Sequence, residues 1–269
     1  MNNQGYFLIG LGTRYIDECY NLALTIRKNN DNRPISLLVN KQDIEYCKSK
    51  NIFDKFIEYH QFDDDIWSKC QNYFEKYCLY PRLYLNRYTP YDETITVDSD
   101  VLCQYNTEDV WNYCRNRQFP VQMTGRKVDY KWHWGTIREV MQAYNKHIPH
   151  VHGGFFYINK NNTKTEDFFV YARSLIPRYD ELNCKRWYAN GIVDEILFAI
   201  THSYFNLFPI EFDEFPIMTF NYECDLIVPS TLQTEGGQNV HMHSPIPFVH
   251  MFDKIEGHKY KCLLSKILQ

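Results

Sequence analysis

The sequence predicts an α/β fold, with a parallel β-sheet flanked by helices. Residues 6–40 follow a strand–helix–strand order, and similar alternation continues to a strand at residues 93–97. A strand–helix–strand unit places its two strands in parallel through a right-handed crossover. The 269 residues, 44% of them hydrophobic, are sufficient for one large domain or two fused ones with a substantial core.

The first unit is the clearest. Tyr6–Ile9 is a short apolar run that ends in Gly10-Leu11-Gly12. Apolar residues then recur with helical spacing over residues 15–26, and the turn formers of Asn29–Asn32 end this helix. The apolar run Ile35–Val39 predicts a buried second strand.

The alternation continues with shorter elements. We expect a helix near residues 42–48, a strand near residues 56–59, and helices over residues 66–77 and 81–88. The last of these begins with a proline, which is favoured at the first helical position. Glu93–Val97 then predicts another buried strand.

The second half of the chain is less regular. Helical patterns occupy residues 134–144, 166–175 and 191–202, and Phe155–Asn159 predicts a strand. Residues 207–250 have the composition of short strands and loops.

The composition argues against several classes of protein. The net charge is −4 and no basic stripe is present, so we expect no nucleic-acid partner. The nine cysteines are irregularly spaced without a C-x-x-C motif, which is typical of free thiols in a reducing compartment. With no signal-peptide pattern and no apolar run of ~18 residues, we expect a cytoplasmic protein without a transmembrane segment.

A candidate metal site follows the strand at residues 93–97. Asp98 and Asp100 come directly after it, and ligands of open α/β sheets bind beyond the carboxyl ends of strands. Side chains two residues apart in a strand share a face, and their carboxylates suit Mg²⁺ or Mn²⁺. The alternative is a loop whose aspartates cap nearby backbone N–H groups. A second acidic triplet, Asp63-Asp64-Asp65, does not follow a comparable strand.

A histidine is the candidate third ligand. His250 ends the apolar run that begins at Pro245, and imidazole would favour Mn²⁺ over Mg²⁺. His241 and His243 are competing candidates. The alternative for His250 is a hydrogen-bonded structural histidine.

Five segments occur in one order along nearly the whole chain: Ile9–Tyr15, Tyr80–Leu85, Thr96–Leu102, His152–Asn159 and Asp194–Leu197, the last followed by His250. Together they resemble the retaining GT-A glycosyltransferases of the glycogenin and bacterial lipooligosaccharide galactosyltransferase type, often called family 8. The resemblance implies a GT-A-type, Rossmann-like fold with a mostly parallel mixed sheet. It divides the chain into a nucleotide-sugar-binding half, residues 1–105, and an acceptor-side half, residues 106–269, fused into one domain.

The resemblance also implies roles for individual residues. Asp98, Asp100 and His250 would hold the metal. Tyr15 would stack on the base, Ser99 would lie near the ribose, and the remaining nucleotide-sugar-binding residues would be Gly10, Leu11, Gly12, Arg82, His152, Gly153 and Gly154.

Asp194 and Glu195 would be the catalytic residues, because a carboxylate beneath the sugar could stabilise an oxocarbenium-like transition state. The alternative is a pair of acids at a helix start, favoured by the helix dipole. Trp132 and Trp134 would stack on an acceptor sugar or, alternatively, pack in the core.

The chain departs from the family at three places. His152 replaces an asparagine, and Val193-Asp194-Glu195 replaces Asp-Gln-Asp. Six residues after His250, Glu256 stands where the family has a lysine, which leaves Lys254 and Lys259 as alternative cations for the diphosphate.

The sequence therefore predicts a metal-dependent glycosyltransferase. It would use Mn²⁺, with Mg²⁺ as an alternative, to transfer a sugar from a UDP-sugar donor to a glycan or protein acceptor with retention. A haloacid-dehalogenase-type phosphatase is one alternative, since the segment Asp98-Ser99-Asp100-Val101 after a strand resembles the aspartate motif of that class, with Asp98 as nucleophile. A non-catalytic sugar-nucleotide binder with the same fold is the other.

Overall fold

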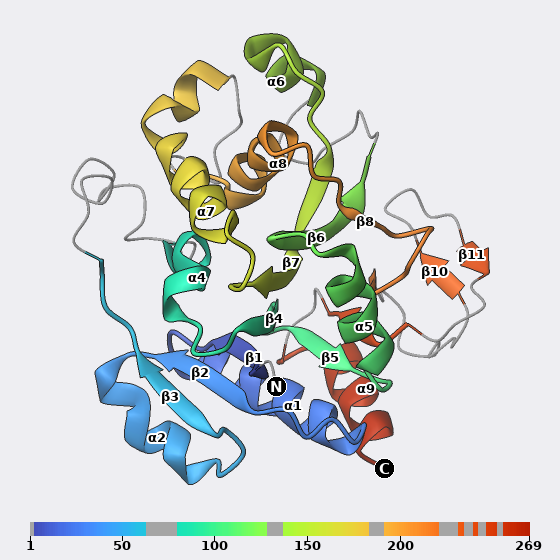
Figure 1. Cartoon of the computed structure of the whole chain (residues 1–269). Coiled ribbons are helices and arrows are strands. Elements are labelled where there is room, and N and C mark those ends of the chain that lie inside the picture. Colours follow the sequence, from blue (N-terminus) through green and yellow to red (C-terminus); the bar gives the residue numbers. More distant parts are fainter. Residues whose placement is uncertain are drawn as a thin grey trace.

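A computed structural model describes residues 3–62, 80–127, 137–182, 191–220, 231–233, 239–241, 246–251 and 255–269. A seven-stranded sheet in the order β3-β2-β1-β4-β7-β6-β8 runs through the centre of the molecule (Figure 1). Its strands are β1 (Gln4–Ile9), β2 (Ile35–Val39), β3 (Lys55–Glu58), β4 (Glu93–Val97), β6 (Val121–Arg126), β7 (His150–Asn159) and β8 (Ile210–Glu211).

The sheet is mixed but mostly parallel, as predicted. β1 pairs in parallel with β2 and β4, β2 with β3, and β6 with β8. Only β7 runs against its neighbours β4 and β6. Strands from both halves of the chain therefore belong to one sheet.

A second, three-stranded sheet connects a late segment to the middle of the chain. It has the order β5-β12-β9, formed by β5 (Val101–Cys103), β12 (Phe248–His250) and β9 (Met218–Phe220). β12 is antiparallel to β5, and His250 is paired with Val101. This register brings His250 to the residues that follow β4. β10 (Thr231–Gln233) and β11 (Asn239–His241) pair antiparallel in a separate two-stranded sheet.

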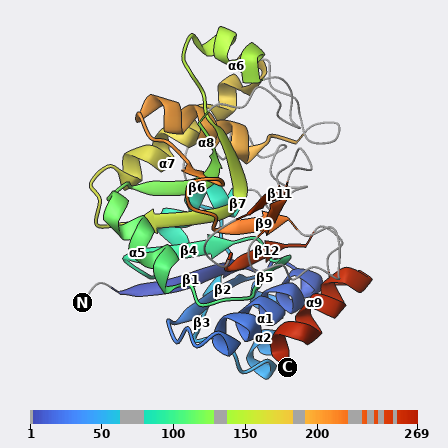
Figure 2. The same ribbon diagram turned by 90° about the vertical axis from the view of Figure 1, so that its right-hand side faces the viewer.

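Helices cover both faces of the central sheet (Figure 2). The described α-helices are α1 (Thr13–Lys28), α2 (Ile44–Ser49), α4 (Leu85–Tyr88), α5 (Glu108–Arg117), α6 (Ile137–Tyr144), α7 (Thr165–Ser174), α8 (Asp194–Tyr204) and α9 (His258–Leu268). Three 3₁₀ segments are added at Lys41–Asp43, Tyr80–Tyr84 and Ile176–Leu182. α1 and α9 lie side by side in both ribbon views.

Two hydrophobic cores lie on opposite faces of the central sheet. Phe7 and Phe156 pack with residues of α7 and α8 on one face of the sheet. Tyr6 and Phe155, their chain neighbours, belong to the core that includes α1, α5 and the second sheet. Successive strand residues point to opposite faces, so one buried strand supplies both cores.

Several predicted boundaries are wrong. The helix expected over Pro81–Tyr88 is a 3₁₀ segment followed by the short α4. β7 begins at His150, five residues before the expected Phe155, and α8 begins at Asp194 rather than Gly191. The helix predicted over residues 66–77 and the acidic triplet at 63–65 lie outside the described residues.

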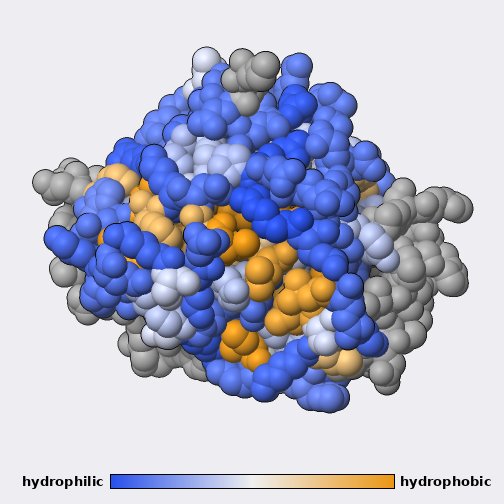
Figure 3. All heavy atoms as spheres, turned by 90° about the horizontal axis from the view of Figure 1, so that it is seen from below, coloured by the Kyte–Doolittle hydropathy of each residue, from blue (hydrophilic) through white to orange (hydrophobic). Residues whose placement is uncertain are grey.

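Among the described residues, no helix has both the length and the apolar character needed to cross a membrane. The face seen from below in Figure 1 is largely hydrophilic, with separate hydrophobic patches (Figure 3).

Candidate functional site

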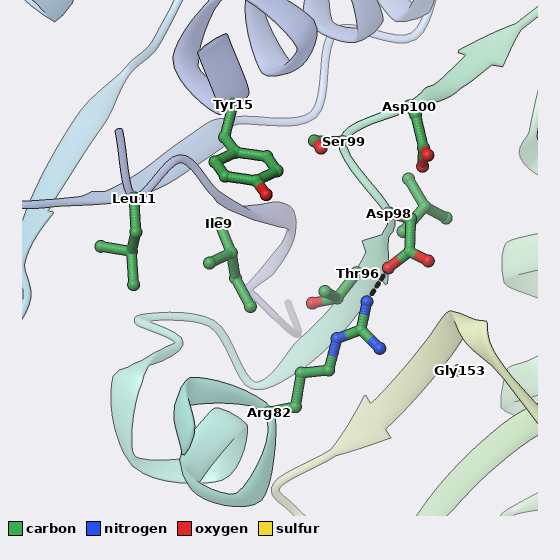
Figure 4. A pocket seen from close by; sticks show the side chains of 10 residues that line it. Ile9, Leu11, Tyr15, Arg82, Thr96, Asp98, Ser99, Asp100 and Gly153 are labelled. Atoms are coloured by element: carbon green, nitrogen blue, oxygen red, sulfur yellow. Dashed lines mark hydrogen bonds and ion pairs between the residues drawn. The ribbon is translucent and has the colours of Figure 1, made fainter. Parts of the chain in front are cut away.

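A pocket with a volume of about 160 Å³ lies at the carboxyl ends of β1 and β4 (Figure 4). Parallel neighbouring strands end at the same edge of a sheet, which is where α/β folds bind ligands. The residues that line the pocket are Ile9, Leu11, Tyr15, Arg82, Thr96, Val97, Asp98, Ser99, Asp100 and Gly153. Seven of the residues predicted to bind the metal or the nucleotide sugar are in this set.

The turn after β4 is held by backbone hydrogen bonds. The Asp98 N–H donates to the Gly154 carbonyl at 3.1 Å, and the Val101 N–H donates to the Asp98 carbonyl at 3.2 Å. The Asp100 carbonyl accepts from the Met251 N–H at 2.9 Å. The turn is therefore fastened both to β7 and to the segment that carries His250.

Asp98, Asp100 and His250 form a cluster suited to a metal ion. His250 Nε2 is 3.0 Å from Asp100 Oδ1 and 3.8 Å from Asp98 Oδ2. One ligand atom from each residue lies within 4.8 Å of the others. Two carboxylates and an imidazole are a donor set that suits a divalent metal ion. Burial acts to lower the pKa of His250, but the hydrogen bond and charge of Asp100 outweigh it and raise this pKa above its usual value. The cluster thus stabilises a positive charge.

Arg82 connects the metal cluster to the start of α8. Its guanidinium donates to Asp98 through Nη2 and to Asp194 Oδ2 through Nη1, the latter at 3.1 Å. Burial raises the pKa of both carboxyls, although the charge of Arg82 acts to lower it. Burial also opposes the charge of Arg82, but its two aspartates keep the Arg82 pKa above the usual value. Arg82 is therefore shared between Asp98 and Asp194, two carboxylates whose negative charges are costly to bury.

Gly153 allows Arg82 and Glu195 to approach the strand. Its N–H donates to Glu195 Oε1 at 2.7 Å. A Cβ atom at this position would lie 2.9 Å from Arg82 Nη1 and 3.2 Å from Glu195 Cγ. Asp194 and Glu195 are both buried and lie directly behind this part of the pocket wall. The first turn of α8 thus brings two acids beside the pocket.

His152 packs behind the metal cluster. Its Nδ1 accepts from the Gly154 N–H at 3.1 Å, and its ring lies edge-on to that of His250 with centroids 5.5 Å apart. A Cβ on Gly154 would lie 2.7 Å from His152 Cε1. Through these contacts, His152 helps to hold the candidate ligand His250 in position.

The opposite end of the pocket is aromatic and apolar. Tyr15 is 39% exposed and lies in the first turn of α1. Gly12 precedes this helix with φ of +114°, a conformation that favours glycine. Gly10 packs against the helix and β2, where an added Cβ would be 3.1 Å from both Ile16 Cγ1 and Leu37 Cδ1.

Of the two lysines predicted as cations for the diphosphate, Lys259 lies in the described part of the chain. Lys259 lies in the first turn of α9 and does not line the pocket. Lys254, Trp132 and Trp134 lie outside the described residues.

Sequence reasoning missed Glu18. It is fully buried, and its Oε2 accepts from Ser99 Oγ at 2.6 Å. Residues three and four apart share a helix face, so Glu18 lies on the apolar face of α1 with Tyr15 and Leu22. The signal in the sequence that could have identified Glu18 was an acidic residue on the apolar face of a helix.

Comparison with known proteins finds matches in fold but not in sequence. No family model and no curated protein matches the sequence. Among solved structures, the galactosyltransferase LgtC in complex with donor and acceptor sugar analogues is similar at 11% identity and a TM-score of 0.60. The match covers 98% of this chain and 95% of LgtC.

Two further glycosyltransferases are similar. The apo form of mouse xyloside xylosyltransferase 1 has 10% identity and a TM-score of 0.59, over 92% of this chain and 96% of that one. The bifunctional glycosyltransferase WbbM has 12% identity and a TM-score of 0.54, over 83% of this chain and 40% of its own. At these identities the likeness shows the fold alone. The predicted GT-A architecture is confirmed, and the chain has the fold of the GT-A glycosyltransferases.

Proposed function

We propose that the protein is a metal-dependent glycosyltransferase that transfers a sugar from a UDP-sugar to a glycan or protein acceptor. The observation that carries this proposal is the cluster of Asp98, Asp100 and His250 at one end of a pocket whose other end is formed by Tyr15. An aromatic ring and a metal-binding cluster in one pocket match the two ends of a nucleoside diphosphate.

In this proposal, one end of the pocket binds the base and the other end binds the metal and the diphosphate. Tyr15 stacks on the base, since an aromatic face binds a base without demanding hydrogen bonds. Asp98, Asp100 and His250 hold Mn²⁺, which supplies charge neutralisation for the diphosphate leaving group when it is bound. Lys254 or Lys259 remains our candidate for a further cation on the diphosphate.

The donor sugar would lie against Gly153, in front of α8. Arg82 holds Asp194 in place, and the Gly153 N–H holds Glu195. The two carboxylates supply negative charge toward the sugar face where positive charge develops in the transition state. In this proposal the transfer proceeds with retention, and Trp132 and Trp134 lie on the acceptor side.

A donor screen tests the proposal. UDP-, GDP- and CMP-sugars are incubated with the protein and Mn²⁺, with and without simple sugar acceptors, and nucleotide release is measured. We expect release from a UDP-sugar that falls at least tenfold in Asp100→Ala, which removes one of the three candidate ligands. Ser174→Ala, on the exposed end of α7, is the matched control and should leave the rate unchanged. No release from any donor would contradict catalysis.

Measurements of UDP binding and of aryl phosphate hydrolysis, added to this screen, separate the alternatives. UDP binding without release from any donor would favour a non-catalytic sugar-nucleotide binder. Hydrolysis of an aryl phosphate that is abolished by Asp98→Asn would favour the phosphatase. The GT-A fold supports glycosyl transfer over phosphate hydrolysis.

A further inference from the structure

A buried carboxylate lies behind the middle residue of the Asp98–Asp100 turn. Glu18 Oε2 accepts from Ser99 Oγ at 2.6 Å, and its Oε1 pairs with Arg14 Nε at 3.2 Å. Arg14 also forms an ion pair through Nη2 with Glu256 Oε2 at 3.3 Å. Burying an unpaired charge is costly, and the guanidinium of Arg14 supplies a partner for the Glu18 carboxylate.

This pairing fixes the direction of the Ser99 hydroxyl. Ser99 Oγ donates its one proton to Glu18 Oε2. The lone pairs of Ser99 Oγ remain for a second partner, and Ser99 lines the pocket. Toward a ligand, Ser99 is therefore an acceptor. It suits a ligand hydroxyl and does not suit a phosphate oxygen.

The position of Ser99 indicates which hydroxyl this is. Figure 4 shows Ser99 between the ring of Tyr15 and the carboxylate of Asp100. With the base on Tyr15 and the diphosphate at Asp98 and Asp100, the pentose that joins them passes Ser99. Pentose hydroxyls are the donors available at that point.

We propose that Glu18 positions Ser99 as the acceptor for a ribose hydroxyl, which makes the site selective for ribonucleotides over deoxyribonucleotides. This inference rests on the proposed function, because that function places a nucleoside diphosphate in the pocket. Glu18 acts through Ser99 and is a positioning residue.

Calorimetry with three nucleotides tests it: UDP, 2′-deoxy-UDP and 3′-deoxy-UDP, each with Mn²⁺. Wild-type protein should bind UDP roughly 3- to 10-fold more tightly than at least one deoxy analogue, as expected for one hydrogen bond. Ser99→Ala should remove this preference, and Ser99→Thr, which keeps a hydroxyl, should retain it. Glu18→Gln should weaken the preference, because an amide can donate to Ser99 and release its proton toward other partners.

Glu93→Gln is the matched control. Glu93 is also a buried acid, but it lies at the other end of β4 and bonds Gln4 and Arg115. Its variant should keep the preference for UDP. If Glu18→Gln does not fold, the Ser99 variants still decide the question.

Equal binding of all three nucleotides to wild type would overturn the inference, as would a preference that persists in Ser99→Ala. Either result would leave the proposed function intact, since UDP would still bind. If none of the nucleotides binds the wild type, the proposed function fails and this inference fails with it.

Discussion

Replacing Arg82 should destabilise the protein in a way that Mn²⁺ can correct. Arg82→Met keeps much of the side-chain volume and removes the cation shared by Asp98 and Asp194. The side chains of these aspartates are 21% and 4% exposed. Removing one partner of a buried ion pair costs about 3–5 kcal/mol. Because Asp98 keeps some contact with water, we expect a loss at the lower end, about 3 kcal/mol.

The loss should depend on pH and on metal. Burial already holds the pKa of both carboxyls above its usual value, and removing Arg82 raises the folded-state pKa further. A raised carboxyl pKa costs stability in full above that pKa, and the cost decreases as the pH falls from it toward the pKa of the unfolded state. The deficit of the variant should therefore shrink between pH 7 and pH 5. At pH 7, Mn²⁺ should stabilise the variant more than the wild type, because Arg82 no longer shares Asp98.

Urea unfolding at both pH values, with and without Mn²⁺, measures these effects. Arg178→Met is the control, since Arg178 pairs with Glu181 at an exposed site and its loss should cost below about 1 kcal/mol. An Arg82→Met variant as stable as the control, or a deficit that grows on acidification, would refute the reasoning.

Two further predictions concern Gly153 and His202. Glycine-to-alanine changes in strands usually stabilise a protein. Gly153→Ala should instead destabilise it by about 1–3 kcal/mol, because the new Cβ would lie 2.9 Å from the restrained Arg82 guanidinium. Urea unfolding measures this change, and unchanged or higher stability would contradict the prediction. Burial lowers the pKa of His202 to about 4, so its neutral form contributes stability that is complete above the usual histidine pKa and is lost as the pH falls toward 4. His202→Gln should reduce acid destabilisation over this range by roughly 3 kcal/mol, and identical pH profiles of unfolding for variant and wild type would contradict it.

The sequence predicted those parts of the fold that local patterns determine. The apolar runs of β1, β2 and β4 and the helical spacing of α1 are visible without knowledge of their partners. β6 was missed because its Gln122 and Thr124 are polar yet buried, and the strand depends on pairing with β7. Elements whose burial comes from distant segments leave weak local signals.

The site was predictable to a similar extent. Position after a strand was enough to select Asp98 and Asp100, but composition could not bring His250 to them, and the competing candidate His243 lies outside the described residues. The position of His250 depends on the pairing of β12 with β5, which sets His250 opposite Val101. Glu18 was missed because a helical acid is ordinarily taken for a solvent-exposed residue. Its burial depends on Ser99 and Arg14, and Ser99 comes from another part of the chain.

The central claim is that Asp98, Asp100 and His250 hold a metal that binds the diphosphate of a UDP-sugar. Calorimetry of UDP with wild type and Asp100→Asn, each with and without Mn²⁺, tests it most directly. We expect Mn²⁺ to tighten UDP binding at least tenfold in the wild type, and this gain to be lost in Asp100→Asn while the fold is kept. UDP affinity that does not change with Mn²⁺ in the wild type, or that gains equally in the variant, would contradict the claim.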